Sequence, residues 1–225
     1  MTGPVPVGQD GGAVTGPEGL ARLVRARGVR DERVLEAIAS VPRADFVPAE
    51  HRERAYLDQP IPIPRGQVTT QPSLVAAMIE GLALEGGERV LEVGTGHGFQ
   101  TALLARLAAR VFSIERFADL ARRASRNLAR HGIGNVELVV GDGTLGLPDE
   151  APFDAIVVAA AHTRVPSPLA LQLADGGRLV QPLGLGGDDE VTLFERRAGA
   201  LERRSTVTPA HFVKLYGAHA FAAGG

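Results

Sequence analysis

The sequence of 225 residues predicts an α/β fold, in which a mostly parallel, doubly wound sheet carries an antiparallel hairpin at one edge. Short apolar runs alternate with helix-length segments between residues 73 and 183, which is typical of a parallel sheet with helices on both faces. Two alternating segments, 190–197 and 204–217, follow with short turns, as in a hairpin. A hydrophobic content of 44% is sufficient for a sizeable core.

The first third of the chain predicts an extension to this core. Residues 1–17 are rich in glycine and proline, and we expect a disordered tail there. Apolar residues at helical spacing over 19–39 predict two helices, with Asp31 capping the second. Residues 41–72 contain many prolines without a sustained period, so we expect an ordered, functional loop. We therefore predict a single domain over 18–225, divided into an extension over 18–72 and a core over 73–217.

The core segments are distinguished by period and length. Short apolar runs are typical of buried strands, whereas apolar residues three or four positions apart indicate helices. In the segment 117–131, apolar residues share one face and arginines occupy the other, so this helix should cover the sheet. We predict helices over 73–84, 99–108 and 117–131, and strands over 89–93, 110–114, 136–140, 153–160 and 177–183.

The composition excludes several classes of function. A formal net charge of −2 gives no basic excess, so we expect no nucleic-acid partner and interpret the arginines of 117–131 as a solvated face. The absence of cysteine excludes disulfides, thiolate zinc sites and a cysteine nucleophile. The sequence contains no zinc-protease pair, serine-hydrolase elbow or phosphate-binding loop, so we expect no metal site.

The sequence also predicts where the protein works. Its first residues lack the basic start and apolar centre of a secretory signal. The longest apolar run, residues 155–161, is much shorter than the roughly 20 residues that cross a bilayer. We expect a cytoplasmic protein with no membrane partner, and a monomer.

A glycine-rich turn, VLEVGTGHGFQ at residues 90–100, marks the candidate ligand site. Gly94, Gly96 and Gly98 allow a close backbone approach, and three glycines in five residues exceed what a simple tight turn needs. The dinucleotide pattern G-x-G-x-x-G requires a glycine where this turn has a phenylalanine. Glu92 would repel a pyrophosphate, but it would attract the cationic sulfonium end of S-adenosyl-L-methionine.

Two further acidic residues end the next strands. Glu115 is suited to accept hydrogen bonds from both ribose hydroxyls, and Asp142 can accept one from an adenine amino group. Because the carboxyl ends of parallel strands meet at one edge of a sheet, Glu92, Glu115 and Asp142 should border one crevice. These three carboxylates predict S-adenosyl-L-methionine as the cofactor.

On these residues the sequence resembles the protein-L-isoaspartate (D-aspartate) O-methyltransferases, from about residue 20 to residue 217. The segments most specific to that family are VPRADFVP (41–48), AYLDQPIPI (55–63), GQVTTQP (66–72), GFQ (98–100) and FVKLYG (212–217). The resemblance implies a Rossmann-like class I methyltransferase fold. It also implies methylation of the free carboxylate of L-isoaspartyl and D-aspartyl residues in damaged proteins, which starts repair through a succinimide.

The same resemblance implies roles for individual residues. Peptides and proteins carrying isoaspartyl residues would be the substrates. Catalytic roles fall on Thr69 and Thr70, and substrate contacts on Gln71, Pro72, Ala160 and His162 of the AAAH turn, and Leu185 of LGLGG. Cofactor contacts fall on Glu92, Gly94, Thr95, Gly96, Gln100, Glu115, Asp142 and Gly143.

The sequence departs from the family pattern at several positions. Thr70 stands where a serine is usual, which keeps the hydroxyl but adds a methyl group. His97 replaces a serine and Phe99 a tyrosine, and Gln181 occupies a normally aliphatic strand position. We interpret His97 as a rim or packing residue, because carboxylate methylation requires no base. Thr69 is also suited to cap the helix that begins near Pro72.

Two alternative functions remain open at this point. One is a related peptide-maturation enzyme that methylates a specific aspartate of a precursor to give a succinimide, and Thr70 keeps that hypothesis open. The other is a non-catalytic module that binds or senses the cofactor. The three strand-end carboxylates argue against the second alternative.

Overall fold

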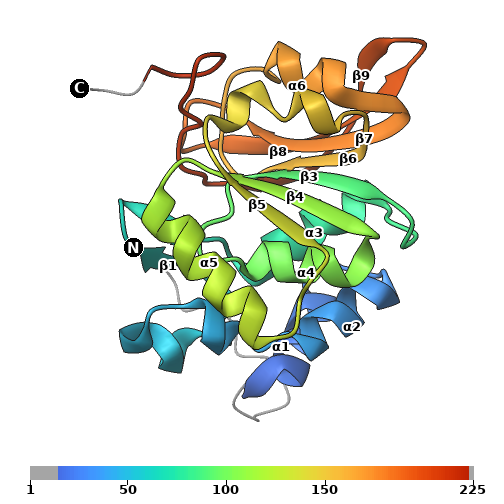
Figure 1. Cartoon of the computed structure of the whole chain (residues 1–225). Coiled ribbons are helices and arrows are strands. Elements are labelled where there is room, and N and C mark those ends of the chain that lie inside the picture. The colour runs from blue at the N-terminus through green and yellow to red at the C-terminus, as the bar shows by residue number, and fades with distance from the viewer. Residues whose placement is uncertain (1–14, 223–225) are drawn as a thin grey trace.

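A computed structural model describes residues 15–222 and shows a sheet of seven strands with helices on both faces (Figure 1). The strands are β3 (Arg89–Val93), β4 (Arg110–Glu115), β5 (Val136–Val140), β6 (Phe153–Val158), β7 (Leu173–Leu183), β8 (Asp189–Arg197) and β9 (Ala200–Ala210). Their spatial order is β5-β4-β3-β6-β7-β8-β9. The pairs from β5 to β7 are parallel, whereas β8 and β9 add antiparallel strands. The predicted α/β fold with an antiparallel edge is therefore confirmed.

Most of the helices cover one face of the sheet. The helices α1 (Gly16–Ala26), α2 (Glu32–Ser40), α3 (Pro72–Leu82), α4 (Phe99–Leu107) and α5 (Ala118–Arg130) lie below it in Figure 1, and α6 (Ser167–Gln172) lies above it. As predicted, the Asp31 side chain caps α2 by accepting from the Arg33 amide at 2.9 Å. No helix within residues 15–222 has the length and apolar character needed to cross a bilayer.

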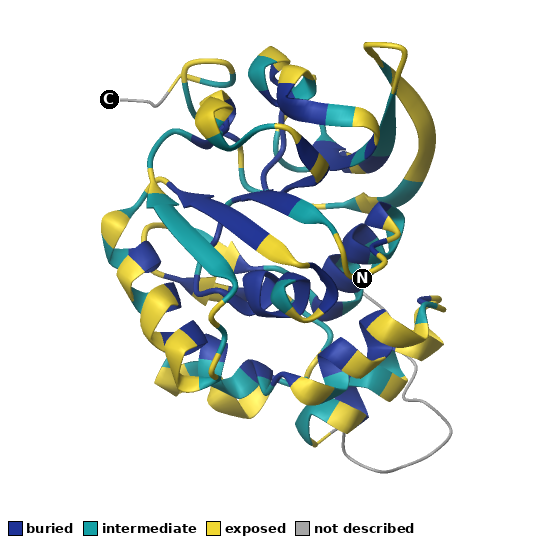
Figure 2. Ribbon diagram, turned by 45° about the vertical axis from the view of Figure 1, so that its right-hand side comes forward, coloured by how far each residue is buried: buried dark blue, intermediate teal, exposed yellow. Residues whose placement is uncertain are grey.

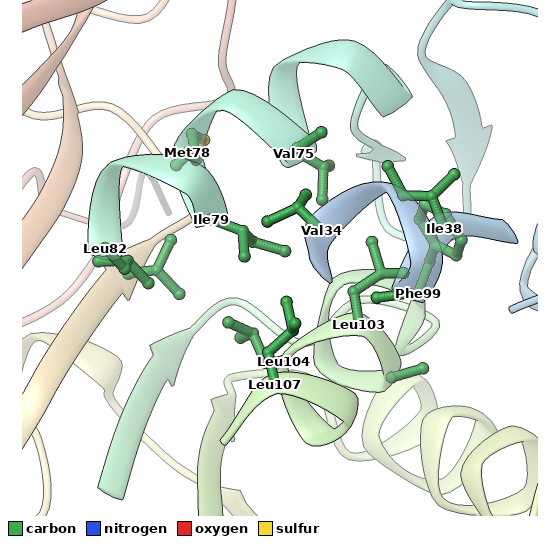
Figure 3. Close-up of a cluster of buried hydrophobic side chains, with 14 of the residues drawn as sticks. Val34, Ile38, Val75, Met78, Ile79, Leu82, Phe99, Leu103, Leu104 and Leu107 are labelled. Atoms are coloured by element: carbon green, nitrogen blue, oxygen red, sulfur yellow. The ribbon is translucent and has the colours of Figure 1, made fainter. Parts of the chain in front are cut away.

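The central strands are buried on both faces. Alternate side chains of a strand point to opposite sides of the sheet, and each side is covered by an apolar cluster. Val90 of β3 joins the apolar cluster under the larger helical layer, and its neighbour Leu91 joins the cluster on the side of α6. Figure 2 shows the central strands mainly buried and the outer helix faces exposed. Figure 3 shows the larger cluster, where side chains from three helices meet: Val34 and Ile38 of α2, Val75, Met78, Ile79 and Leu82 of α3, and Phe99, Leu103, Leu104 and Leu107 of α4.

The extension is more regular than the sequence predicts. Residues 1–14 of the predicted disordered tail lie outside the described residues, and α1 already begins at Gly16, before the predicted end of the tail. The segment 41–72 contains the 3-10 helices η1 (Arg43–Phe46) and η2 (Ala49–Arg54) and a hairpin of β1 (Ile61–Ile63) and β2 (Gln67–Thr69), where a loop was predicted. The strand signal was weak because β1 is only three residues long, with an exposed proline between two buried isoleucines.

Two parts of the core also differ from the prediction. The last strand, predicted over 204–217, is β9 and ends at Ala210; residues 211–222, the C-terminal segment, then turn back over the carboxyl ends of the strands. The connection from β5 to β6 contains only the 3-10 turns η3 (Gly143–Leu145) and η4 (Pro148–Glu150), where a helix-length connection was predicted. Prolines at 148 and 152 prevent a continuous helix there, because proline lacks an amide donor.

β9 forms one edge of the sheet. Its central residues Glu202, Arg203 and Arg204 are exposed, and the strand also contains Pro209. Arg203 forms an ion pair with Glu190 of the neighbouring strand β8. The β9 edge of the sheet is therefore charged at residues 202–204.

Removal of a core side chain between the helices should destabilise the fold. Leu103 of α4 is fully buried in the cluster of Figure 3, so we expect Leu103→Ala to lower the free energy of unfolding by about 2 to 5 kcal/mol. Leu171→Ala is the matched control, because that leucine is 72% exposed; its effect should stay within about 0.5 kcal/mol. Urea unfolding measures both variants, and equal losses would contradict the assignment of this cluster as core.

Candidate active site

The carboxyl ends of β3, β4 and β6 border a crevice made of two adjoining cavities. Their volumes are about 610 Å³ and 500 Å³ including the open space at the mouths. Gln67, Gly94, Glu115, Ala159 and Val213 line both cavities. The predicted site residues that line the crevice are Thr69, Thr70, Gly94, Thr95, Gly96, Gln100, Glu115, Gly143 and Ala160. A crevice is therefore present at the strand ends, but of the three carboxylates predicted to border it only Glu115 is among its lining residues.

The glycine turn uses its amides within the protein. The Gly94 amide donates to the carbonyl of Ile114 and the Gly96 amide to the Glu115 carboxylate, each at 2.9 Å. Gly94 has a φ of 99°, and a Cβ there would lie 3.3 Å from the Ala159 side chain. Phosphate groups bind to free amides at such turns, and the amides of Gly94 and Gly96 are already bonded within the protein. The geometry agrees with the sequence argument against a dinucleotide.

Glu115 lies at the centre of the crevice and is 5% exposed. Its Oε2 accepts from the Gly96 amide at 2.9 Å and its Oε1 from the Phe117 amide at 3.0 Å. Burial raises the pKa of Glu115, and these amide donors oppose that shift. A carboxylate oxygen accepts about two hydrogen bonds, so each oxygen retains capacity for a ligand hydroxyl. This carboxylate therefore fits a diol such as ribose.

Glu92 does not line the crevice, in contrast to its predicted contact with the cofactor. It shares a face of β3 with Val90, is fully buried, and accepts from Gln100 Nε2 at 3.0 Å and from Thr101 Oγ1 and Ser113 Oγ at 2.5 Å. Burial raises its pKa to about 7, against the three hydrogen bonds. Strand pairing explains the difference, because Glu92 lies beside Ser113 in register, beneath the turn.

The Glu92 carboxylate is nevertheless connected to the crevice by hydrogen bonds. Gln100, one of its donors, lines the first cavity. Thr95 also lines that cavity, and its hydroxyl lies 2.5 Å from the hydroxyl of Ser113, which donates to Glu92. Glu92, Ser113, Thr95, Gln100 and Thr101 form one buried hydrogen-bond network under the glycine turn.

Asp142 is also occupied within the protein. Its Oδ1 accepts from the amide and hydroxyl of Thr144, and its Oδ2 accepts from the Ala218 amide of the C-terminal segment at 2.7 Å. Burial opposes ionisation, but these hydrogen bonds outweigh it and lower the pKa of Asp142. The neighbouring Gly143 does line the second cavity, and a Cβ at that position would overlap the Val93 side chain. After β5, Gly143 lines the crevice, whereas the predicted carboxylate of Asp142 is not among the lining residues.

The residues of GQVTTQP, here called the acceptor loop (66–72), reach the crevice from the extension. Thr69 ends β2 opposite Ile61, and Thr70 follows it; both line the first cavity. Gln71 lies on the far side of the loop, in a groove that Thr70 also lines, and Pro72 is buried at the start of α3. The structure therefore brings both threonines to the crevice, but not Gln71 or Pro72.

Asp58 anchors the acceptor loop and was missed by sequence reasoning. Its Oδ1 accepts from the Ser73 amide at 2.9 Å, and its Oδ2 accepts from Ser73 Oγ at 2.9 Å and Gln71 Nε2 at 3.0 Å. Gln71 is the N-cap of α3 without a side-chain cap, so the suggested capping role of Thr69 is wrong; Asp58 supplies the missing acceptor. The sequence feature that could have indicated this role is the motif AYLDQPIPI, in which Asp58 is the one acidic residue.

The two remaining predicted loops lie beside the crevice. Ala160 lines the second cavity, but His162 is buried with its ring edge against Phe221 and is not among the lining residues described. Leu185 is 66% exposed at the tip of LGLGG. Asp189 holds that loop by accepting from the Gly186 and Gly187 amides. Its Oδ2 also accepts from the Phe212 amide, which joins the loop to the C-terminal segment.

Three of the positions that depart from the family pattern, His97, Phe99 and Gln181, are buried, and His97 and Phe99 also line the first cavity. Burial lowers the pKa of His97, and the nearby Arg123 charge lowers it further, which favours the neutral ring expected of a packing residue. The Phe99 ring lies 6.0 Å from the ring of Phe46, centre to centre. Gln181 is buried in β7 and donates to the carbonyl of Arg164 at 3.1 Å, which ties the strand to the chain after the AAAH turn.

Comparison with known proteins identifies the fold and its relatives. The family model described as Protein-L-isoaspartate(D-aspartate) O-methyltransferase matches residues 17–220. The protein-L-isoaspartate O-methyltransferase of Methanoculleus marisnigri is 52% identical over 179 residues, 80% of this chain and 81% of its own.

Two solved structures agree with the computed fold. A protein-L-isoaspartate O-methyltransferase is 29% identical and superposes with a TM-score of 0.81 over 91% of this chain and 67% of its own. A Plasmodium falciparum protein described under the same activity was solved in complex with S-adenosyl-L-homocysteine; it is 24% identical, with a TM-score of 0.77 over 90% of this chain and 99% of its own. The likeness to the second structure concerns the fold.

Burial of Glu92 should make stability depend on pH. Its folded pKa of about 7 lies above the ordinary value of 4.5, so its stabilising contribution is complete below pH 4.5 and is lost as the pH rises to about 7. We expect the unfolding free energy of the native protein, relative to Glu92→Gln, to fall by roughly 2 to 3 kcal/mol between pH 5 and pH 8. Urea unfolding at both pH values tests this, and parallel changes in the two proteins would contradict it.

Proposed function

The chain belongs to the protein-L-isoaspartate(D-aspartate) O-methyltransferase family, and on that premise we propose how its crevice performs S-adenosyl-L-methionine-dependent methylation of isoaspartyl residues. The observation that carries the proposal is the meeting of two sets of residues in one crevice. Glu115 and the glycine turn come from the sheet, and Thr69 and Thr70 come from the extension.

The residues of the crevice fit the cofactor. Glu115 has acceptor capacity for the ribose hydroxyls, and Gly94 and Gly96 form a backbone wall without free phosphate-binding amides. Gly143 borders the adenine side in this proposal. Thr95 and Gln100 face the methionine side and connect it to the buried Glu92 carboxylate. Glu92 and Asp142 are then positioning residues, one under the turn and one under the C-terminal segment.

The acceptor end of the crevice is polar and partly enclosed. Bound S-adenosyl-L-methionine supplies an electrophilic methyl group on a sulfonium. The isoaspartyl carboxylate is already ionised at neutral pH, since its pKa is about 4, so the protein need not remove a proton. Thr69 and Thr70 would hold that carboxylate through hydroxyl and main-chain donors, and the enclosing residues would keep water away. The site would therefore act mainly by aligning the acceptor carboxylate with the methyl group.

The chemistry after methyl transfer belongs to the product. A carboxylate oxygen forms the new bond to carbon, the carbon–sulfur bond breaks, and the sulfur keeps the electron pair. The methoxy group of the ester is a better leaving group than the oxygen of an ionised carboxylate, so the neighbouring main-chain nitrogen can attack the ester carbonyl, lose its proton and close a succinimide as methanol is released. Hydrolysis of the succinimide returns part of the chain to normal aspartate, which is the repair.

The two alternative functions lose support. The Methanoculleus marisnigri relative, 52% identical over 80% of this chain, is named for isoaspartate methylation, so the peptide-maturation hypothesis is not supported. Membership of an enzyme family likewise argues against a non-catalytic module. Thr70 retains the hydroxyl and lies in the crevice, as isoaspartyl methylation requires.

Contacts beyond the crevice complete the proposal. Gln71 in the groove behind the acceptor loop and Leu185 at its exposed loop tip would contact the substrate chain, whereas Pro72 and His162 would shape the site from buried positions. We further propose that the enzyme acts as a cytoplasmic monomer, without nucleic acid or membrane. A net charge of −2 and the absence of cysteine support this part.

Matched peptides test the function directly. We expect methyl transfer from labelled S-adenosyl-L-methionine to a peptide with one L-isoaspartyl residue to exceed transfer to the same peptide with aspartate by at least about 100-fold, because the site aligns one carboxylate. The label should be lost on mild alkaline treatment, as for a methyl ester. Preferential methylation of the aspartyl peptide would contradict the proposal.

Removal of the Glu115 charge should weaken cofactor binding. We expect Glu115→Gln to bind S-adenosyl-L-homocysteine about ten- to 100-fold more weakly, because hydrogen bonds to a charged group contribute about 1.5 to 3 kcal/mol. Glu137→Gln is the matched control, since Glu137 forms an exposed ion pair with Arg110 on the sheet. Titration calorimetry measures both variants, and equal affinities would contradict the assignment of Glu115.

A further inference from the structure

Arg43 of VPRADFVP is a buried cation with no part in the reaction described above. It is 0% exposed, and its guanidinium donates to four main-chain carbonyls. These belong to Ala55 at 3.0 Å, Leu57 at 3.2 Å, Gln59 at 3.0 Å and Thr70 at 3.1 Å. One side chain thus joins the segment before β1 to the acceptor loop.

The geometry of these bonds requires a guanidinium. Its planar fork presents donors in fixed directions, whereas the ammonium of a lysine is a compact charge with three donors. Burial lowers the pKa of Arg43 to about 10, and the nearby Asp58 carboxylate opposes the shift, so the side chain stays cationic at neutral pH. The guanidinium also lies 5.7 Å from the centre of the Phe99 ring, at the start of α4.

Thr70 lies between two buried charges. Arg43 holds its carbonyl, and Asp58 holds the next residues through Gln71 Nε2 and the Ser73 amide. With its carbonyl fixed and the following turn fixed, Thr70 has little freedom to change the direction of its amide and hydroxyl. Both Thr69 and Thr70 line the cavity that Glu115 also lines.

From this geometry we infer that Arg43 is a positioning residue for methyl transfer, which aligns Thr70 and therefore the acceptor carboxylate with the cofactor. The inference rests on the proposed function of the acceptor loop. It separates two parts of the site, because Arg43 bonds to the acceptor loop but not to the glycine turn or Glu115. Its loss should therefore impair alignment more than cofactor binding.

Arg43→Lys tests the inference in the full-length enzyme. We expect kcat for the isoaspartyl peptide to fall about 100-fold, since a displacement of about 1 Å at a reacting group has that effect, with a change in the affinity for S-adenosyl-L-homocysteine of no more than about threefold. Hydrogen exchange should become faster over residues 55–73 and remain unchanged over β3 and β4. Arg43→Lys keeps the positive charge, whereas Arg43→Gln removes it. Arg43→Gln should therefore lower kcat further and speed hydrogen exchange over residues 55–73 more than Arg43→Lys.

Two control variants separate positioning from general stability. Arg89→Lys makes the same substitution at an arginine that bonds to the carbonyl of Glu150, at the amino end of β3, opposite the crevice. Leu35→Ala destabilises the same helical layer through a buried side chain of α2. Both should retain kcat per cofactor-binding site when measured well below the unfolding temperature. A merely structural Arg43 would behave like Leu35→Ala, with lower stability but normal kcat, and that outcome would overturn the inference.

The hydrogen-exchange measurement keeps this inference distinct from the proposed function. If the native enzyme methylates no isoaspartyl peptide, the proposed function fails, whatever Arg43 does. If the native enzyme is active and Arg43→Lys loosens residues 55–73 without lowering kcat, the function stands and the inference fails. Slow, unchanged exchange over residues 55–73 in Arg43→Lys would also overturn it.

Discussion

The burial of one positive charge, the guanidinium of Arg43, constrains the fold of the extension that precedes the core sheet. A guanidinium removed from water is costly unless most of its donors are paired, and the two terminal nitrogens of Arg43 donate to the carbonyls of residues 55, 57, 59 and 70, whereas its Nε has no partner. Those carbonyls must converge on one point, so the proline-rich chain between them folds back as a compact loop. The guanidinium of Arg43 also lies 5.7 Å from the centre of the Phe99 ring, which links the extension to the start of α4.

The crevice illustrates a second constraint, which is the pairing of glycine amides within the protein near a ligand site. In the glycine turn the amides of Gly94 and Gly96 bond to a carbonyl and to Glu115, and this leaves a wall without a phosphate cradle. Acidic residues beneath the turn remain compatible with a cationic cofactor, whereas a phosphate would meet repulsion. The same fold can therefore serve different cofactors by changing which amides are free.

The sequence predicted the sheet and the place of the site, but not how its charged residues are arranged. Strand periodicity led to Glu115, Gly94 and Gly96, which line the crevice, because those positions follow from where strands end. Glu92 and Asp142 were assigned to direct contacts, yet Ser113 and the C-terminal segment occupy their carboxylates. Such partners lie 21 and 76 residues away, and sequence spacing does not reveal contacts of that range. Arg43 and Asp58 were missed for the same reason.

The charged edge of the sheet matters for an enzyme that handles damaged proteins. Damaged chains expose unpaired strands, and a long free edge such as β9 would offer them a template for pairing and aggregation. Exposed Glu202, Arg203 and Arg204 make such pairing unfavourable, and Pro209 removes one amide donor from the strand. The charges and the proline of β9 thus protect this edge of the sheet against pairing with another extended chain.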